Sequence, residues 1–401
     1  MDIVTRRRLF GAALPLAFLW PASMFAQAMP DNAAPAAPPV TMEVRYVADA
    51  IGVLAGGSDR GPRALGNLDV TTDGDLDRLI GWRGAKAHVH LLNNHGGAIN
   101  TLAGTIQGVD NIEVADGRTK LYEAWVEQRL WQDRVSLLVG LSDLNVDFYQ
   151  DDSAGLLIAP AFGIGSELAA TGPNGPSIFP STALTFRADV RVGGTGYVRA
   201  AIVNARAGVL GDADGMDLGM HDGALLIAEA GMTANGKLAI GAWRYTRRQD
   251  DLFARDVAGT PVHRIATGAY VLLDQRVSGD DDRGVDVFLR AGLSEGRTTP
   301  FVGGFQTGVL VRGAIPGRPR SELSTGVFQG ALSSAFRRSL ATAGQHPDAT
   351  ETEFELTYRD TVASFLTIQP DLQYVRRAHL ERGHRGVLIG GVRISMTFSR
   401  S

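Results

Sequence analysis

Apolar and polar side chains alternate along much of this chain. In residues 182–194 (TALTFRADVRVGG), Leu184, Phe186 and Val190 alternate with polar positions that include Arg187. A period of two places successive side chains on opposite faces of a β-strand. One face of this strand must therefore meet an apolar medium, while the other face holds three charges close together.

The same alternation recurs from the N-terminal third to the end of the chain. Clear examples are residues 120–131, 223–232, 237–246, 268–277, 284–296, 352–360 and 386–398. We count about fifteen such segments of roughly 10–13 residues, whereas strands of soluble proteins usually have about 5–6 and outer-membrane strands about 9–11. The pattern therefore predicts an all-β fold, a transmembrane antiparallel up-and-down β-barrel of about 16 strands.

The N-terminal residues predict export from the cytoplasm. An apolar run from Leu9 to Trp20 follows three arginines, and the small-residue motif AQA comes after it. This order is typical of a secretory signal peptide over residues 1–28. We expect a Pro/Ala-rich leader over 29–40 and the barrel domain over 41–401, with about 23 residues for each strand and its connection.

In a barrel of this kind the apolar face meets lipid and the polar face lines a water-filled channel. A soluble β-sandwich, such as a secreted lectin, explains the alternation too, but it does not predict strands this long. Aromatic side chains near strand ends fit the girdle at the membrane interface. The aromatic residues in such positions are Trp131, Tyr149, Trp243, Tyr245, Tyr358 and Phe398.

Composition narrows the chemistry. The chain has no cysteine, which excludes disulfides, thiolate metal sites and cysteine nucleophiles. The formal net charge is −4, and no basic stripe with interleaved aromatics indicates nucleic-acid binding. Residues 151–180 lack strand periodicity and form a loop with a short helix. This loop either folds inward and narrows the pore or stays outside the barrel.

Across the mature chain, the segments resemble those of the carbohydrate-selective porin family (OprB type) of Gram-negative outer membranes. The resembling stretches are LGNLDV (65–70), IGWRGAKAHVHLLNNHGG (80–97), TIQGVDNIEVADGRTKLYEAWVEQ (105–128), SIFPSTALTFRADV (177–190), DGALLIAEAGM (222–232), LVRGAIPGRPRSELSTGVFQGAL (310–332) and ETEFELTYRDTVASFLTIQPDLQYV (351–375). The resemblance implies a 16-stranded barrel that admits sugars by passive diffusion. It implies mono- or oligosaccharides, outer-membrane lipid and the barrel-assembly machinery as partners. Porins of this kind often form homotrimers.

A porin needs no cofactor and performs no bond chemistry, so its site is the narrowest part of the lumen. Arg, Asp and Glu bond sugar hydroxyls in charge-assisted pairs, and an aromatic ring covers a C–H face. Strand parity predicts as lumen-lining Glu123, Trp125, Glu127, Arg129, Arg187, Asp189, Arg191, Glu229, Arg244, Asp274, Arg290 and Arg393. Trp125, Glu123, Arg187 and Glu229 are the strongest candidates because they lie in stretches that match the family.

Two sharper motifs carry less weight. GLSEG (292–296) matches a serine nucleophile motif, but no helix follows it. An outer-membrane lipase- or protease-like barrel would need Ser294 beside His263 or His346, and a general diffusion pore is a further alternative. HVH (88–90) has a spacing that binds zinc, but no third ligand is apparent. We therefore expect neither catalytic residues nor a metal site.

Overall fold

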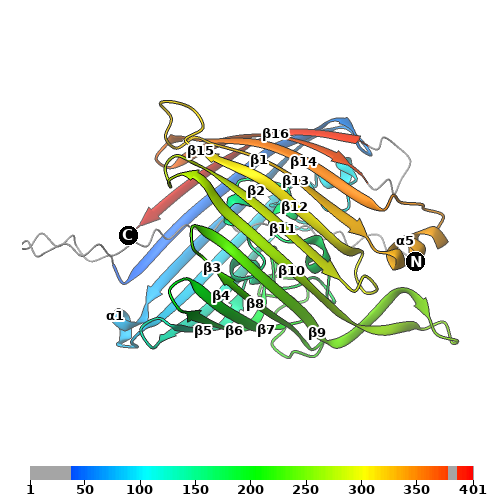
Figure 1. Cartoon of the computed structure of the whole chain (residues 1–401), viewed down its shortest axis with the longest axis horizontal. Coiled ribbons are helices and arrows are strands. Elements are labelled where there is room, and N and C mark those ends of the chain that lie inside the picture. Colours follow the sequence, from blue (N-terminus) through cyan, green and yellow to red (C-terminus); the bar gives the residue numbers. More distant parts are fainter. Residues whose placement is uncertain (1–37, 378–385, 401) are drawn as a thin grey trace, which may run out of the picture.

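The chain forms a closed barrel of 16 antiparallel strands in which every strand pairs with its sequence neighbours (Figure 1). The computed structural model describes residues 38–377 and 386–400; the predicted signal peptide and nearly all of the leader lie outside them. The strands are β1 (Val40–Gly56), β2 (Gly61–Asp75), β3 (Ala85–Gly96), β4 (Thr119–Leu130), β5 (Val135–Ser142), β6 (Ala183–Val192), β7 (Gly196–Asn204), β8 (Ala224–Met232), β9 (Gly236–Arg255), β10 (Pro261–Gly279), β11 (Gly284–Ser294), β12 (Phe301–Arg312), β13 (Glu322–Leu332), β14 (Thr350–Ala363), β15 (Leu366–Arg376) and β16 (Gly386–Arg400). Pairing of β1 with β16 closes the sheet, which leaves no strand edge to face lipid.

The connections differ in length at the two ends of the barrel. One end has tight turns, such as residues 193–195 and 233–235, and the other has connections as long as 97–118 and 143–182. Outer-membrane barrels place their short turns in the periplasm and their longer loops outside the cell. The short helical elements are α1 (Leu76–Ile80), α2 (Asn100–Ala103), α3 (Leu144–Asp147), η1 (Asp152–Ala154), η2 (Pro160–Phe162), α4 (Ser166–Ala169) and α5 (Ser334–Thr342).

Among residues 38–377 and 386–400, none of the helices has the length and apolar character that a membrane crossing requires.

Strand β6 shows that alternation sorts side chains as predicted. Phe186 and Val190 are exposed on the outer surface, whereas Thr185 and Arg187 are buried inside. In a membrane, lipid would cover the outward-facing side chains and shield these apolar residues from water. The predicted fold class, a transmembrane up-and-down barrel of about 16 strands, is confirmed.

Residues 143–182, which we call the inner segment, fold into the barrel and pack against its inner wall (Figure 1). Its Phe148, Tyr149 and Leu168 pack with wall residues that include Leu225 and Tyr270, and all of them are almost fully buried. The sequence left open whether residues 151–180 turn inward or outward. The packing shows the inward arrangement, and the inward fold already starts at the end of β5.

Two local features change the predicted faces. A β-bulge opposite His90 and Leu91 turns both Tyr122 and Glu123 inward, although alternation placed Tyr122 outside. In β9, Trp243 and Tyr245 pack into the core around the inner segment rather than joining the girdle. The predicted girdle position of Tyr149 is wrong for the same reason. The expected aromatic residues with large exposed fractions are Trp131 and Phe398.

Candidate functional site

A polar cavity of about 560 Å³ lies inside the barrel toward its short-turn end, bounded by β4–β9 and the start of the inner segment. Its cationic lining residues are Arg129, Arg187, Arg191, Arg199 and Lys237, and its acidic ones are Glu127, Asp133, Asp147, Asp152 and Asp189. Small-molecule sites typically have volumes of about 300–1,000 Å³. The two signs of charge balance, so the wall offers many hydrogen-bonding groups without a net charge.

Arg187 is the centre of a chain of ion pairs along this wall. Its Nε donates to Asp147 Oδ2 at 3.1 Å and its Nη2 to Glu127 Oε1 at 3.3 Å. Arg129 Nε approaches the other oxygen of Glu127 at 3.2 Å, and Arg199 continues the chain beyond Asp147. Pairing holds each guanidinium and carboxylate group in place, which preorganises hydrogen-bond donors and acceptors for a polar solute.

A second cavity of about 540 Å³ adjoins the first, since Asp152, Thr233 and Lys237 line both. Its wall carries Arg276 and Arg312, both of which pair with the carboxylate of Asp286. The polar lining therefore continues around the short-turn end of the lumen.

Toward the other end lies a smaller cavity of about 240 Å³. Lys120 lines it and places its ammonium group 2.9 Å from Asp212 Oδ1 and 2.9 Å from the carbonyl oxygen of Pro180. Phe179 supplies an aromatic ring to the same wall. The lumen thus has polar space on both sides of the packed inner segment.

Glu229 faces the lumen, where it holds the inner segment instead of facing water. It is 2% exposed and accepts the backbone N–H of Tyr149 at 3.0 Å. The hydroxyls of Tyr197 and Tyr270 donate to its two oxygens at 2.7 and 2.8 Å. Lys237 Nζ lies 3.5 Å away and balances its charge.

Arg290, on β11, anchors the same segment. It is 1% exposed, and its guanidinium donates to the carbonyl oxygens of Tyr149 and Gly163 at 2.7 Å and of Ala161 at 2.9 Å. Asp274 likewise accepts from the backbone N–H of Ser153 at 2.8 Å. Both side chains point inward, and both form hydrogen bonds with backbone groups of the inner segment.

Arg393 serves the other inward connection, residues 97–118. It forms a bidentate pair with Asp49, with bonds of 2.9 and 2.6 Å, and donates to Asn111 Oδ1 at 2.7 Å. Sequence reasoning did not select two further anchors of inward-folded backbone, Glu351 and Glu355, which bind the N–H groups of residues 106–107 and 158–159. Strand parity gave no means of separating such anchors from water-facing residues.

Burial changes the acidity of carboxyl groups in the inner segment, which lies outside the membrane-spanning strands. Burial raises the pKa of Asp151 to about 7, although Arg290 opposes the rise. Burial also raises the pKa of Asp143 to about 7, and the carboxylate of Glu123 adds to the effect. Protonation therefore favours the packed arrangement of this segment at both positions.

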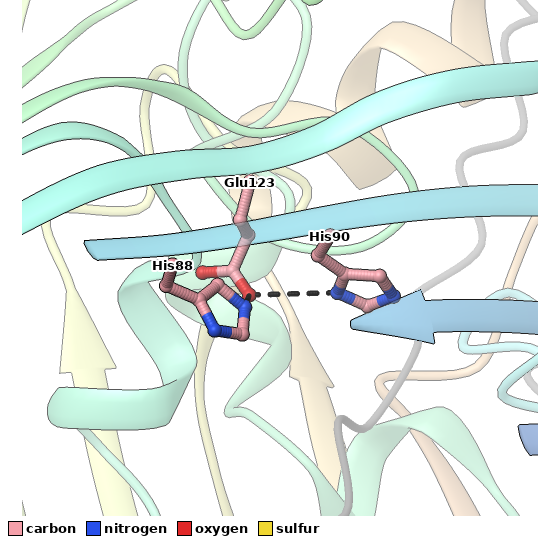
Figure 2. Close-up of side chains that lie close together, drawn as sticks. All are labelled: His88, His90 and Glu123. Atoms are coloured by element: carbon pink, nitrogen blue, oxygen red, sulfur yellow. Dashed lines mark ion pairs between the residues drawn. The ribbon is translucent and has the colours of Figure 1, made fainter. Parts of the chain in front are cut away.

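Glu123 and Trp125 lie on β4 and both contact histidines of β3. The ring of Trp125 stacks on that of His88 with centroids 4.9 Å apart. Glu123 Oε2 lies 3.8 Å from His88 Nε2 and 3.6 Å from His90 Nδ1 (Figure 2). Glu123 is thus the third potential metal-ligating residue beside HVH that the sequence did not reveal.

Arg244 is the one predicted lumen residue that the structure places on the outer surface. It is exposed beside an outward hollow, and its neighbours Trp243 and Tyr245 are buried inside. Strand β9 has 20 residues, about twice the length that a membrane crossing needs. Its outer face changes from the apolar Ile240 to polar residues from Arg244 on. An exposed arginine fits where the strand extends beyond the hydrocarbon.

The structure also adds residues that the sequence did not identify. Arg199 lines the larger cavity from β7, whose inward positions include the apolar Ala201 and Val203, so alternation there is weak. Asp147 reaches the same cavity from α3, and only the inward fold of its segment brings it there. Lys237 lies in the alternating segment 237–246, and this position could have identified it as a candidate lumen residue.

Ser294 has the contacts of a structural hydroxyl. Its Oγ donates to the carbonyl oxygen of Phe301 at 2.7 Å and accepts the N–H of Gly296 at 3.1 Å. His263 pairs with Asp250 on its exposed hairpin. In the part of the chain that the structure describes, no contact joins Ser294 to His263 or His346.

A closed barrel with 16 long strands, an apolar outer face and polar lumen cavities defines an outer-membrane porin. The model of the carbohydrate-selective porin, OprB family, matches residues 59–398, and the chain belongs to this family.

Known relatives agree with this assignment. Porin B of Pseudomonas aeruginosa is 20% identical, covering 89% of this chain and 87% of the relative. The high-pH structure of Pseudomonas putida OprB superposes with a TM-score of 0.79 at 21% identity, covering 90% of this chain and 94% of that one. The outer membrane channel DcaP of Acinetobacter baumannii gives a TM-score of 0.56 at 12% identity, covering 90% and 97%. The fold and the family point to a channel rather than an enzyme.

Proposed function

We propose that this outer-membrane porin lets neutral mono- or oligosaccharides cross by passive diffusion along the paired charges around Arg187, and that it performs no bond chemistry. The balanced lining of the 560 Å³ cavity carries the proposal. Guanidinium and carboxylate groups that already bond to one another can exchange these hydrogen bonds for bonds to sugar hydroxyls at little net cost in free energy. Weak exchange of this kind permits both entry and release.

Charge balance favours a neutral solute over an ion. A wall with one dominant sign would concentrate the opposite ion, whereas equal numbers of both signs give no such preference. The cavity therefore suits a solute rich in hydroxyls that carries no charge. A general diffusion pore is the competing function, because it needs the same water-filled space but no binding.

Planar-bilayer conductance of the refolded mature protein tests this proposal. We expect discrete current steps that glucose or a short glucan blocks partly and in a concentration-dependent manner. Gluconate has as many carbon atoms as glucose and a comparable set of hydroxyls but carries a negative charge, so it should block the current less well than glucose at equal concentration. Steps that glucose does not change would contradict sugar binding and leave a general diffusion pore.

We also propose that the barrel assembles as a homotrimer through an apolar hollow of about 990 Å³ on its outer surface. Four alanines of adjacent strands lie side by side there: Ala188, Ala200, Ala228 and Ala242. Small residues allow close approach of membrane surfaces. OmpT of Vibrio cholerae, solved in a trimer form, shares the fold at a TM-score of 0.51. Native mass spectrometry should show trimers that Ala200→Trp dissociates.

A further inference from the structure

We propose that His88, His90 and Glu123 form a binding site for a divalent transition-metal ion, with Zn²⁺ as the first candidate. Figure 2 shows the two imidazoles extending from β3 and the carboxylate of Glu123, from β4, placed between them. The three ligand atoms all lie within 4.8 Å of one another. Two imidazole nitrogens and a carboxylate oxygen form a donor set that suits zinc.

The spacing of the donor atoms fits a small ion. Glu123 Oε2 is 3.8 Å from His88 Nε2 and 3.6 Å from His90 Nδ1. Zinc bonds of about 2.0–2.2 Å in tetrahedral geometry place ligand atoms about 3.3 Å apart. The carboxylate oxygen would need to approach each ring by only a few tenths of an ångström, and the two histidine nitrogens, which lie within 4.8 Å of each other, would need to approach by up to about 1.5 Å.

The outer nitrogens of both rings are fixed by carboxylates. His88 Nδ1 lies 2.8 Å from Asp73 Oδ1, and His90 Nε2 lies 3.0 Å from Asp69 Oδ1. An ionised carboxylate only accepts hydrogen bonds, so these nitrogens carry the protons. Carboxylate partners of this kind orient metal-binding histidines and strengthen them as ligands.

The inner nitrogens, His88 Nε2 and His90 Nδ1, both face Glu123 Oε2, and in the neutral rings they direct lone pairs toward it. Two lone pairs that face a carboxylate oxygen repel it unless a proton or a cation lies between them. A divalent ion removes this repulsion and bonds to all three atoms. It also compensates a wall on which Asp69, Asp73 and Glu123 lie together, with Arg45 opposite Asp69 in the strand pairing.

Exposure and anchoring of the cluster support a site that is accessible and rigid. The side chains of His88 and His90 are 13% exposed and that of Glu123 is 11% exposed, so water can complete the coordination. Glu123 Oε1 accepts the backbone N–H of Asp143 at 2.9 Å, which holds the carboxylate in place. A bound ion would thereby brace β3 and β4 at the point where the inner segment begins.

Calorimetric titration of Zn²⁺ into the chelator-treated, refolded mature protein in detergent tests the site. We expect one ion per chain, and Glu123→Gln and His90→Gln should each weaken binding by about a hundredfold or more. Loss of an outer carboxylate, in Asp73→Asn, should weaken it by about 10–100-fold. Equal Zn²⁺ binding by the unmodified protein and by Glu123→Gln and His90→Gln, or no binding at all, would overturn the proposal.

Two controls separate this site from adventitious binding. His95 lies on the same strand but contacts the hydroxyl of Tyr46 and the side chain of Asn93, so His95→Gln should change affinity by less than about twofold. His263→Gln, at an exposed ion pair, should likewise have no effect. The X-ray absorption spectrum of bound Zn²⁺ in the unmodified protein avoids any folding defect of a variant. A spectrum that shows two imidazole ligands would support the site. A spectrum that shows no imidazole ligand would contradict it.

Discussion

Arg187 and Arg290 have the same side chain, the same inward parity and the same alternating sequence context, yet they belong to different parts of the lumen. Arg187 pairs with carboxylates and lines a cavity of about 560 Å³. Arg290 is 1% exposed and donates to carbonyl oxygens of the inner segment. An inward-facing position in the alternation therefore predicts only that the arginine will have a polar partner. The fold of the inner segment decides whether that partner is a solute or the backbone of the segment.

The two regions should also respond differently to mutation. Arg290 and Glu229 form hydrogen bonds with buried backbone groups that water cannot reach and that would otherwise lack these partners. Around Arg187 the charges satisfy one another and stay beside open space. Loss of a charge should release structure in the first region and alter solute binding in the second.

Arg290→Met should have the largest effect. It leaves the carbonyl oxygens of Tyr149, Gly163 and Ala161 without this donor, at a cost of about 1–3 kcal/mol for each one that stays unpaired. We expect the inner segment to detach, conductance to rise several-fold and residues 143–182 to become sensitive to protease. The matched control is Arg248→Met, on the exposed outer face of β9 and outside the apolar hollow, which should leave both measurements unchanged.

The outcome that would contradict this prediction is an Arg290→Met channel with the conductance and protease resistance of the unmodified protein. Arg290 would then contribute little to the anchoring, and the contrast between the two regions would be lost.

A pH change should have the second-largest effect. Because burial raises the pKa of Asp151 to about 7 from a usual 3.8, the packed segment is most stable with this carboxyl protonated. That stabilisation is fully present below about pH 4 and is lost as the pH rises through about 7. Between pH 5 and pH 8 ionisation of Asp151 alone should cost the packed segment about 3 kcal/mol, visible as lower protection factors against hydrogen exchange at residues 143–182.

Asp151→Asn should remove about half of this pH dependence, because the amide does not ionise whereas Asp143, whose pKa burial also raises to about 7, still does. The neighbouring Asp152, whose side chain is exposed, provides the control, and Asp152→Asn should retain the full dependence. Equal protection factors at pH 5 and pH 8 in the unmodified protein would show that Asp151 does not couple to packing.

Arg187→Gln should have the smallest effect on structure but a specific effect on transport. It removes donors to Glu127 and Asp147 that we expect sugar hydroxyls to share. Sugar block of the current should weaken about tenfold, which corresponds to about 1.4 kcal/mol, while protease resistance stays unchanged. Arg248→Gln is the control, and equal sugar block in both variants would remove Arg187 from the binding path.

The sequence by itself determined the barrel and the general direction of most of its side chains. Alternation over long segments separated Phe186 from Arg187 correctly, because a period of two is a local property of each strand. Alternation failed at Tyr122, where a bulge inserts a residue, and the choice of the inward face failed at Arg244, where the strand extends past the apolar layer. Neither the bulge nor the height of a strand in the membrane is encoded in local periodicity.

Only the tertiary structure decided what each inward side chain contacts. The inner segment follows β5 in sequence but binds Glu229, Arg290 and Glu355 on distant strands, so its direction depends on contacts across the whole barrel. In the same way, the pairing of β3 with β4 brings Glu123 to His88 and His90 across a connection of more than twenty residues. A local pattern fixes a face, whereas register, strand height and long-range closure fix the partners on that face.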